Sequence, residues 1–238
     1  MSGERQITSM SGNKMAGIQC WLGDGQSDQI RIGHSFTVTS ERAFEPHEHL
    51  FKINDMQSHI YQVLSGVVGV YNMLPDGRRQ IVTFYYPGDL IGIEESESWR
   101  YHGEVLCRSR VRSIPITIID RLLETEPGFG QAMLETLATE LAEIREQLLS
   151  LGQKSAIEKV ATFLLRISRR NLREGGNQHS LYLPMTRSEI GDYLGLTIET
   201  VSRNISKLKT SGLIHVLNKN TVQILDLPKL EELADGNS

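Results

Sequence analysis

Apolar residues alternate with polar ones in short runs between Ile30 and about Ile119. The runs are rich in Val, Ile, Tyr and Phe, and turn residues separate them, as in HIYQVLSGVVGVYNML, PDGR and RQIVTFYYPGDLIGI. This composition and spacing are typical of antiparallel strands joined by tight turns. We therefore predict a β-sandwich or barrel over residues 26–125, preceded by a loose polar tail over residues 1–25.

The apolar period changes after Glu126. Six apolar residues follow at alternating spacings of three and four: Leu134, Leu137, Leu141, Ile144, Leu148 and Leu151. This is the a/d seam of a heptad repeat, on a helix whose other positions are rich in Glu. The seam predicts a dimerisation helix over residues 126–152 and a homodimer. The alternative is a single helix that lies on the core of its own domain.

The remaining chain, residues 153–238, mixes helical and strand patterns. An amphipathic helix is predicted from about Ser155 to Leu172, and it ends in the basic and then Gly-rich segment RRNLREGGNQ. A short strand, two helices separated by a tight turn, and a hairpin that turns at NKN follow. The sequence therefore predicts an α+β protein with two domains and a connecting helix.

Composition limits the class of protein. The chain has 238 residues, enough for one large or two modest domains, and no apolar run approaches the length of a membrane span. The N-terminus has no apolar segment of the kind found in secretory signals, and two cysteines, Cys20 and Cys107, do not suggest a disulfide framework. We expect a cytoplasmic protein without a membrane partner.

The charge is unevenly distributed. Residues 153–225 hold eleven Lys and Arg against five Asp and Glu, whereas the whole chain has a net charge of −4. A basic C-terminal third on an acidic body favours a polyanionic partner, although a basic face without a partner is the alternative.

The two short helices carry the strongest candidate chemistry. Gly195 stands at the turn between them, Thr197 can cap the second helix, and Glu199 in its first turn suits the helix dipole. In DNA-binding helix-turn-helix motifs the second helix enters the major groove, where Arg pairs with guanine and a carboxylate accepts from cytosine. Glu199 and Arg203 suit this role, but they could equally form a weak surface ion pair.

The segment LPMTRSEIGDYLGLTIETVSRNISKLKTSGLI resembles the winged helix-turn-helix of the CRP/FNR superfamily of bacterial transcription regulators, and ETVSR is similar to the FNR and FixK branches. The resemblance extends to IYQVLSGVVGVY and YYPGDLIG, which look like the family's β-roll, and to the Leu seam. It implies an N-terminal antiparallel β-roll (a jelly roll like that of cyclic-nucleotide-binding domains), a long dimerisation helix and a C-terminal winged helix-turn-helix.

The resemblance also implies roles for individual residues. Glu199, Ser202 and Arg203 would read bases in a palindrome with TTGAT-like half-sites, and Ile198 could pack on a thymine methyl group. One departure from the family is Asn204, where many members have an apolar residue. Phosphate contacts are expected from Arg187, Thr197, Lys207, Lys209 and Lys219, the last of these at the tip of the wing.

The residues expected for a bound signal do not match the family patterns. The segment IGIEESESWRYHGEV has Glu94 out of register for a cyclic-nucleotide site and offers only Arg100 as a cation. A four-cysteine [4Fe–4S] cluster cannot be built from the two cysteines of one chain, short of ligands shared between subunits, and Arg112 aligns with the fourth ligand position. Axial haem ligands are available only as isolated histidines: His34, His47, His49, His59 and His102.

Two alternatives stay open. The PHEH segment (residues 46–49) with His59 could form a metal site in a cupin-like barrel, although no further ligand has a helpful spacing. Cys107 could be a redox thiol, but it could also be a small buried side chain within a strand. We expect no metal, no cofactor and no enzymatic activity. The resemblance implies a FixK-like regulator, chiefly an activator in oxygen-responsive gene programmes, which contacts RNA polymerase through a loop such as Leu74 to Gln80.

Overall fold

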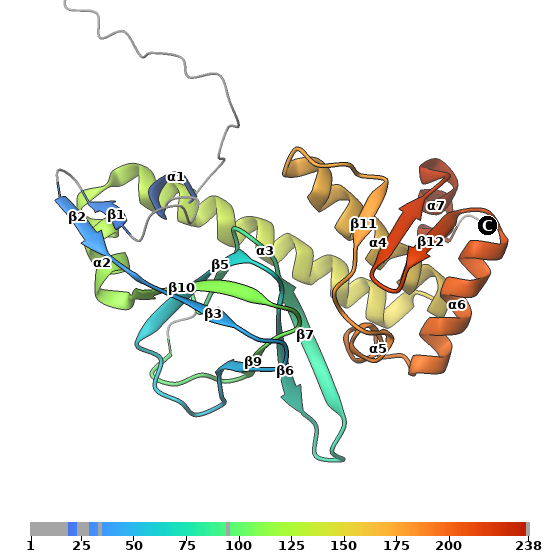
Figure 1. Cartoon of the computed structure of the whole chain (residues 1–238), viewed down its shortest axis with the longest axis horizontal. Coiled ribbons are helices and arrows are strands. Elements are labelled where there is room, and N and C mark those ends of the chain that lie inside the picture. The colour runs from blue at the N-terminus through green and yellow to red at the C-terminus, as the bar shows by residue number, and fades with distance from the viewer. Residues whose placement is uncertain (1–18, 23–28, 33–34, 94–95, 237–238) are drawn as a thin grey trace, which may run out of the picture.

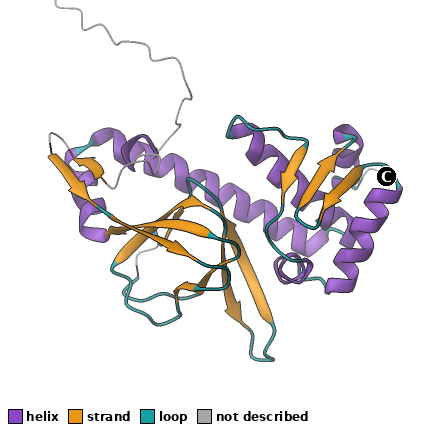
Figure 2. Cartoon of the chain, viewed as in Figure 1, coloured by secondary structure: helices purple, strands orange, loops and turns teal. Residues whose placement is uncertain are grey.

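The computed structural model describes residues 19–22, 29–32, 35–93 and 96–236. It contains an N-terminal β-roll, a long helix beside it and a C-terminal unit of helices with a small sheet (Figures 1 and 2). The strands of the N-terminal part are β1 (Gln29–Ile32), β2 (Ser35–Val38), β3 (Ser40–Phe44), β4 (His49–Phe51), β5 (His59–Ser65), β6 (Val68–Met73), β7 (Arg79–Tyr85), β8 (Leu90–Ile91), β9 (His102–Val105) and β10 (Ser109–Pro115).

The predicted antiparallel β-roll is confirmed. Its strands form two four-stranded sheets, ordered β3-β10-β5-β8 and β4-β9-β6-β7, and β1 pairs with β2 separately. Both sheets contribute buried side chains to one core, for example Val63 and Val111 from the first sheet and Val68 and Val105 from the second. The alternation seen in the sequence is therefore the alternation between this core and the outer faces.

Three helices follow or flank the β-roll: α1 (Gln19–Leu22), α2 (Ile116–Thr125) and α3 (Pro127–Gln153). Pro127 occupies the first position of α3, where its missing N–H costs nothing. Leu22 of α1 and Phe129 of α3 are fully buried in a second core with β5 and β10. From that core α3 extends past the β-roll to the C-terminal unit (Figure 1).

The heptad seam of α3 is mostly uncovered in the single chain. Leu134, Leu137, Leu141, Ile144 and Leu148 are between 38 and 64 % exposed, so α3 does not bury these side chains in its own domain. Leu151 differs, because it is partly buried and its Cδ2 lies 3.8 Å from where a Cβ on Gly195 would stand. The last seam residue therefore contacts the C-terminal unit of the same chain.

The C-terminal unit is a winged helix-turn-helix, as predicted. Its elements are α4 (Ala156–Arg173), β11 (Ser180–Tyr182), α5 (Arg187–Leu194), α6 (Ile198–Thr210), β12 (Ile214–Asn218), β13 (Thr221–Ile224) and α7 (Leu227–Ala234). The three strands form an antiparallel sheet in the order β11-β13-β12. Ser155 with Glu158 and Thr186 with Glu189 form capping boxes that start α4 and α5.

The β-roll and the C-terminal unit share one hydrophobic core. Val67, Ile81 and Phe84 of the β-roll pack in the same buried cluster as Phe163 of α4 and Tyr193 of α5. The two units therefore cannot rotate freely. None of the helices in the described part of the chain is long and apolar enough to cross a bilayer.

A close crossing joins α5 to α6. Gly195 ends α5 in the left-handed conformation, with φ 63° and ψ 39°, which glycine adopts without steric cost. Gly191, one turn earlier, lies so close to the next segment that an added Cβ would stand 2.6 Å from the Leu196 carbonyl oxygen.

We therefore expect Gly191→Ala to destabilise the protein by about 1–3 kcal/mol, because the obstructing atom belongs to the backbone and cannot rotate away. Gly152→Ala is the control, since no atom lies within 4 Å of its added Cβ in α3. That change should stabilise the protein by about 0.4–1 kcal/mol. Urea unfolding of both variants measures the difference, and a Gly191→Ala variant as stable as the wild type would contradict the close crossing.

Candidate nucleic-acid interface

Helix α6 has one buried and one exposed side. Val201, Asn204, Ile205 and Leu208 are buried, and Val201 and Leu208 have no exposed surface. The opposite side carries the predicted base-reading residues, all of them exposed: Ile198, Glu199, Ser202 and Arg203. Their spacings of one, three and four residues place them together around the first turns of α6.

The start of α6 is fixed by the predicted cap. The Thr197 side chain accepts a hydrogen bond from the Thr200 N–H at 3.3 Å. Hydrogen bonds from its own backbone N–H and from the Thr197 hydroxyl hold the pKa of the Glu199 carboxyl below its usual value. Glu199 therefore presents an ionised carboxylate, which can only accept hydrogen bonds.

The charge of Arg203 contributes to the lowered pKa of Glu199 but is not held in a close ion pair. Its Nη2 donates to the Thr200 hydroxyl at 3.3 Å, and it forms no ion pair with Glu199 or with any other described residue. The weak surface ion pair that the sequence offered as an alternative is absent from the described residues. Both side chains stand side by side with their functional groups available to a partner.

Asn204 does not belong to this exposed surface. Only 5 % of the residue is exposed, and its Nδ2 donates to the Thr200 carbonyl in the preceding turn at 2.8 Å. The amide is thus satisfied within α6. Asn204 therefore adds no polar contact to the exposed surface of α6.

Most of the residues predicted to contact phosphate are exposed as well. Thr197, Lys207 and Lys209 are exposed on α6, and Lys219 is exposed in the turn between β12 and β13. Arg187, at the first position of α5, is half-buried, and burial lowers the pKa of its guanidinium. A half-buried cation next to a helix N-terminus favours a nearby anion.

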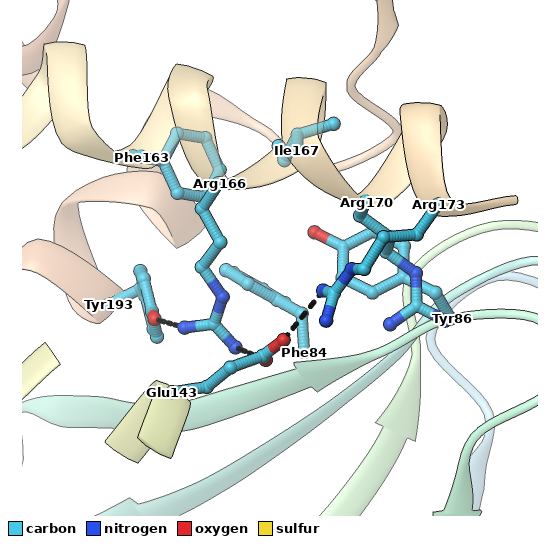
Figure 3. A pocket seen from close by; sticks show the side chains of 9 residues that line it. All are labelled: Phe84, Tyr86, Glu143, Phe163, Arg166, Ile167, Arg170, Arg173 and Tyr193. Carbon is cyan, nitrogen blue, oxygen red and sulfur yellow. Dashed lines mark hydrogen bonds and ion pairs between the residues drawn. The ribbon is translucent and has the colours of Figure 1, made fainter. Parts of the chain in front are cut away.

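The sequence did not reveal how α4 is attached to α3. The Glu143 carboxylate of α3 accepts from Arg166 at 2.9 Å and from Arg173 at 2.8 Å, and Arg166 also donates to the Tyr193 hydroxyl (Figure 3). Burial alone would raise the pKa of Glu143, but the hydrogen bond from Arg173 and the charge of Arg166 lower it. This junction connects α3 with the helix-turn-helix.

Arg112 proves to be a structural residue. It is fully buried in β10, where its guanidinium donates to the Leu22 carbonyl, to Gln62 Oε1 at 3.2 Å and to Glu41 Oε1 at 2.8 Å. The residue at the aligned fourth-ligand position therefore ties α1 to β3 and β5. Arg100 is exposed at the surface, and Glu94 lies outside the described residues.

The histidines of the β-roll engage other groups. His47 Nδ1 lies 2.7 Å from Glu104, His49 Nε2 lies 3.0 Å from the Tyr71 hydroxyl, and His59 Nδ1 lies 2.8 Å from the Ser58 hydroxyl. No three His, Cys, Asp or Glu side chains converge as a metal site among the described residues. The cupin-like alternative is therefore not favoured.

Cys107 lies in the turn between β9 and β10, where its neighbour Ser109 donates to its carbonyl oxygen. Its predicted place within a strand is wrong, because residues 106–108 form the bend through which the chain passes from β9 in one sheet to β10 in the other. The side chain is partly buried against the shared core. A redox role of Cys107 stays a prediction. Cys20 falls in α1, and its side chain and His34 lie outside the described residues.

Comparison with known proteins supports this geometry. Residues 158–233 match the model of the Crp-like helix-turn-helix domain, and residues 41–126 match that of the cyclic nucleotide-binding domain. The nitrogen fixation regulation protein FixK of Bradyrhizobium diazoefficiens is 38 % identical over 191 residues, which cover 80 % of each chain. The anaerobic regulatory protein of Haemophilus influenzae is 32 % identical over 84 % of this chain and 78 % of its own.

Solved structures agree with these relatives. FixK2 from Bradyrhizobium japonicum superimposes with a TM-score of 0.76 at 34 % identity, covering 83 % of this chain and 98 % of that one. The match includes both the β-roll and the winged helix-turn-helix, so the similarity is not confined to one domain. The chain belongs to the CRP/FNR superfamily of DNA-binding transcription regulators, on its FixK-like branch.

Proposed function

We propose that this protein is a cytoplasmic, homodimeric activator that binds a palindrome with TTGAT-like half-sites without a bound small-molecule effector. One observation carries the proposal: the exposed side of α6 presents Glu199, Ser202 and Arg203 together, and Arg203 forms no close ion pair with a described carboxylate. Arg suits the O6/N7 pair of guanine, and an ionised Glu suits cytosine N4. The relatives named FixK and anaerobic regulatory protein support a role in an oxygen-responsive gene programme.

The phosphate contacts complete this interface. Lys207, Lys209 and Lys219 stand around the base-reading surface, and Arg187 lies at the N-terminus of the neighbouring helix α5. Contacts of this kind fix the position of a protein on the duplex without reading its sequence. The bases are then left to Glu199, Ser202, Arg203 and Ile198, the last through its 47 % exposed side chain.

A dimer follows from the seam on α3. Five of its six side chains remain exposed in the single chain at a spacing that suits a second helix, and burying apolar surface of this extent is favourable. Two copies related by a two-fold axis would present two α6 helices to a palindrome.

The interior of the β-roll supports effector independence. Phe51 and Trp99 stack there with ring centroids 3.6 Å apart, and Tyr61 stacks on Trp99 at 5.7 Å. Gly92 and Gly103 permit this packing, because a Cβ at either position would collide with Trp99 or Phe51. The chain's own aromatic rings thus fill the space between the sheets.

A cavity of about 730 Å³ lies elsewhere, between β7, α3 and α4. Ile144, Leu148 and Leu151 of the seam form part of its wall, so a second protomer docked on the seam would cover it. We therefore assign this space to the dimer interface.

The contact with RNA polymerase is the least constrained part of the proposal. Within the segment Leu74 to Gln80, residues 75–78 are exposed at the tip of the hairpin between β6 and β7. Arg79 and Gln80 instead turn toward α5. Only the hairpin tip is thus available to a polymerase subunit.

The direct test is selection of DNA from a random pool by the untreated full-length protein. Enrichment of a palindrome with TTGAT-like half-sites supports both the function and its independence of an effector. Failure to enrich any sequence, or enrichment only after a small molecule is added, would overturn the corresponding part of the proposal.

Arg203→Ala should weaken binding to the selected palindrome by about 1–3 kcal/mol per half-site and relax the preference for guanine, because the variant lacks the bidentate donor. Lys219→Ala should weaken all sequences alike and reduce the dependence of log K on log salt by about one per protomer. Competition titrations with palindromic and random duplexes at several salt concentrations measure both effects. Equal losses of Arg203→Ala on the two duplexes would contradict base reading.

Leu148→Glu should dissociate the dimer, because it places a charge from each protomer within the apolar seam. Leu149→Glu is a matched control: the two neighbours are 64 and 60 % exposed, but Leu149 lies off the seam. Sedimentation at micromolar concentration should show a monomer for the first variant and a dimer for the second. A dimeric Leu148→Glu variant would count against the seam as the interface.

A further inference from the structure

The side chain of Arg79 joins the β-roll to the helix-turn-helix. It lies at the start of β7 and is surrounded by three carboxylates. Its Nε donates to Asp192 Oδ2 at 3.0 Å, its Nη1 donates to Glu104 Oε2 at 3.3 Å, and its Nη2 lies 3.6 Å from Glu189 Oε1. Glu104 belongs to β9, whereas Glu189 and Asp192 belong to α5. One guanidinium therefore bridges both units.

The guanidinium compensates the charge of these carboxylates, although Glu104 also contacts His47 and Glu189 also accepts from Thr186. The Glu104 and Glu189 side chains are only 9 and 3 % exposed, and buried carboxylates need a compensating charge. Asp192 stands in the last turn of α5, where the helix dipole disfavours a negative charge. Although burial would lower the pKa of Arg79, its hydrogen bond and charge interaction with Asp192 raise it.

Two glutamine side chains donate hydrogen bonds to backbone carbonyls at the same end of α5. Gln80 Nε2 donates to the Asp192 carbonyl at 2.6 Å, and Gln147 Nε2 of α3 donates to the Tyr193 carbonyl at 3.2 Å. These carbonyls belong to the last turn of α5, just before the Gly195 turn, where helices leave carbonyl groups unpaired. Strand β7 and helix α3 thus fix the point from which α6 departs.

The position of α6 follows from that of α5. The close approach of Gly191 to the Leu196 carbonyl allows little sliding between the two helices. A contact that fixes α5 on β7 therefore also fixes the direction of α6 relative to α3. In a dimer built on α3, this direction determines the separation and the relative rotation of the two α6 helices.

We propose that Arg79 and Gln80 are positioning residues that set the half-site spacing which the dimer accepts. They do not touch DNA, and they act through α5. This inference rests on the proposed homodimer on a palindrome. One base pair more or less between half-sites shifts them by about 3.4 Å and rotates them by about 35°. A firmly held pair of α6 helices cannot follow such a change, whereas a loosened pair can.

Arg78 provides a matched control. It is the neighbouring arginine on the same hairpin, its side chain is 75 % exposed, and its ion pair is with Asp76 of the same turn, not with α5. Arg78→Ala removes an arginine from the hairpin and leaves the contact with α5 in place.

Full-length wild type, Arg79→Ala and Arg78→Ala are each titrated with four duplexes. These are the selected palindrome, two versions whose spacer is one base pair shorter or longer, and one version that carries a substituted guanine. The wild type and Arg78→Ala should lose about tenfold or more in affinity on the altered spacers. Arg79→Ala should lose less than about threefold on them, while its penalty for the substituted guanine stays that of the wild type.

The inference is overturned if Arg79→Ala keeps the spacer preference of the wild type, if it loses base discrimination together with spacer discrimination, or if Arg78→Ala relaxes the spacer preference as Arg79→Ala does. Stoichiometric titration corrects for any unfolded fraction. Gln80→Leu, which removes one hydrogen bond and no charge, should relax the spacer preference to an intermediate degree; an unchanged preference in this variant also contradicts the inference. If the wild type selects no palindrome, the proposed function fails instead.

Discussion

Tyr193 is the side chain on which the arrangement of the units depends. It belongs to the first helix of the helix-turn-helix and is 2 % exposed. Its ring packs against Phe84 of β7 at 5.0 Å and against Phe163 of α4 at 5.8 Å between centroids, and its hydroxyl accepts from Arg166. Burial raises the pKa of this hydroxyl to about 12, so it stays protonated at physiological pH. One aromatic contact therefore joins the β-roll, α4 and the DNA-binding helices.

In the folded chain, part of the basic charge of the C-terminal third is paired with acidic residues of the same chain. The sequence shows eleven basic residues against five acidic ones over residues 153–225. All four arginines of α4 form ion pairs within the chain. Arg166 and Arg173 pair with Glu143, Arg169 with Glu146, and Arg170 with Asp89 and Glu174. The acidic residues of α3 are in part the partners of this basic helix. The charge available to DNA is therefore smaller than the count suggests.

The features that the sequence predicted well are local ones. A heptad spacing, a glycine at a left-handed turn and a threonine at a helix start each act within a few residues, so Gly195 and Thr197 could be assigned their roles directly. The exposed side of α6 followed in the same way from its period, together with the family resemblance.

Contacts between distant parts of the chain could not be predicted. Arg79 and Asp192 are separated by 113 positions, and no periodic pattern relates a strand to a helix so far away. From sequence alone the segment Leu74 to Gln80 is one loop, whereas in the structure its last two residues face α5. One local signal was present: Asp192 is an acidic residue near a helix C-terminus, where a charge of that sign needs a partner.

If the protein acts without an effector, as proposed, the role of the β-roll is to hold the DNA-binding unit in position. Phe51, Trp99 and Tyr61 already occupy the space between its sheets, and a ligand could enter only by displacing well-packed rings. The outer strand β7 meanwhile supplies Phe84 to the shared core and Arg79 to α5. The same sheets thus keep a rigid interior and a rigid contact with the DNA-binding unit. In this arrangement the β-roll holds the DNA-binding unit in position, and the proposed independence of an effector would leave control to the amount or the modification of the protein.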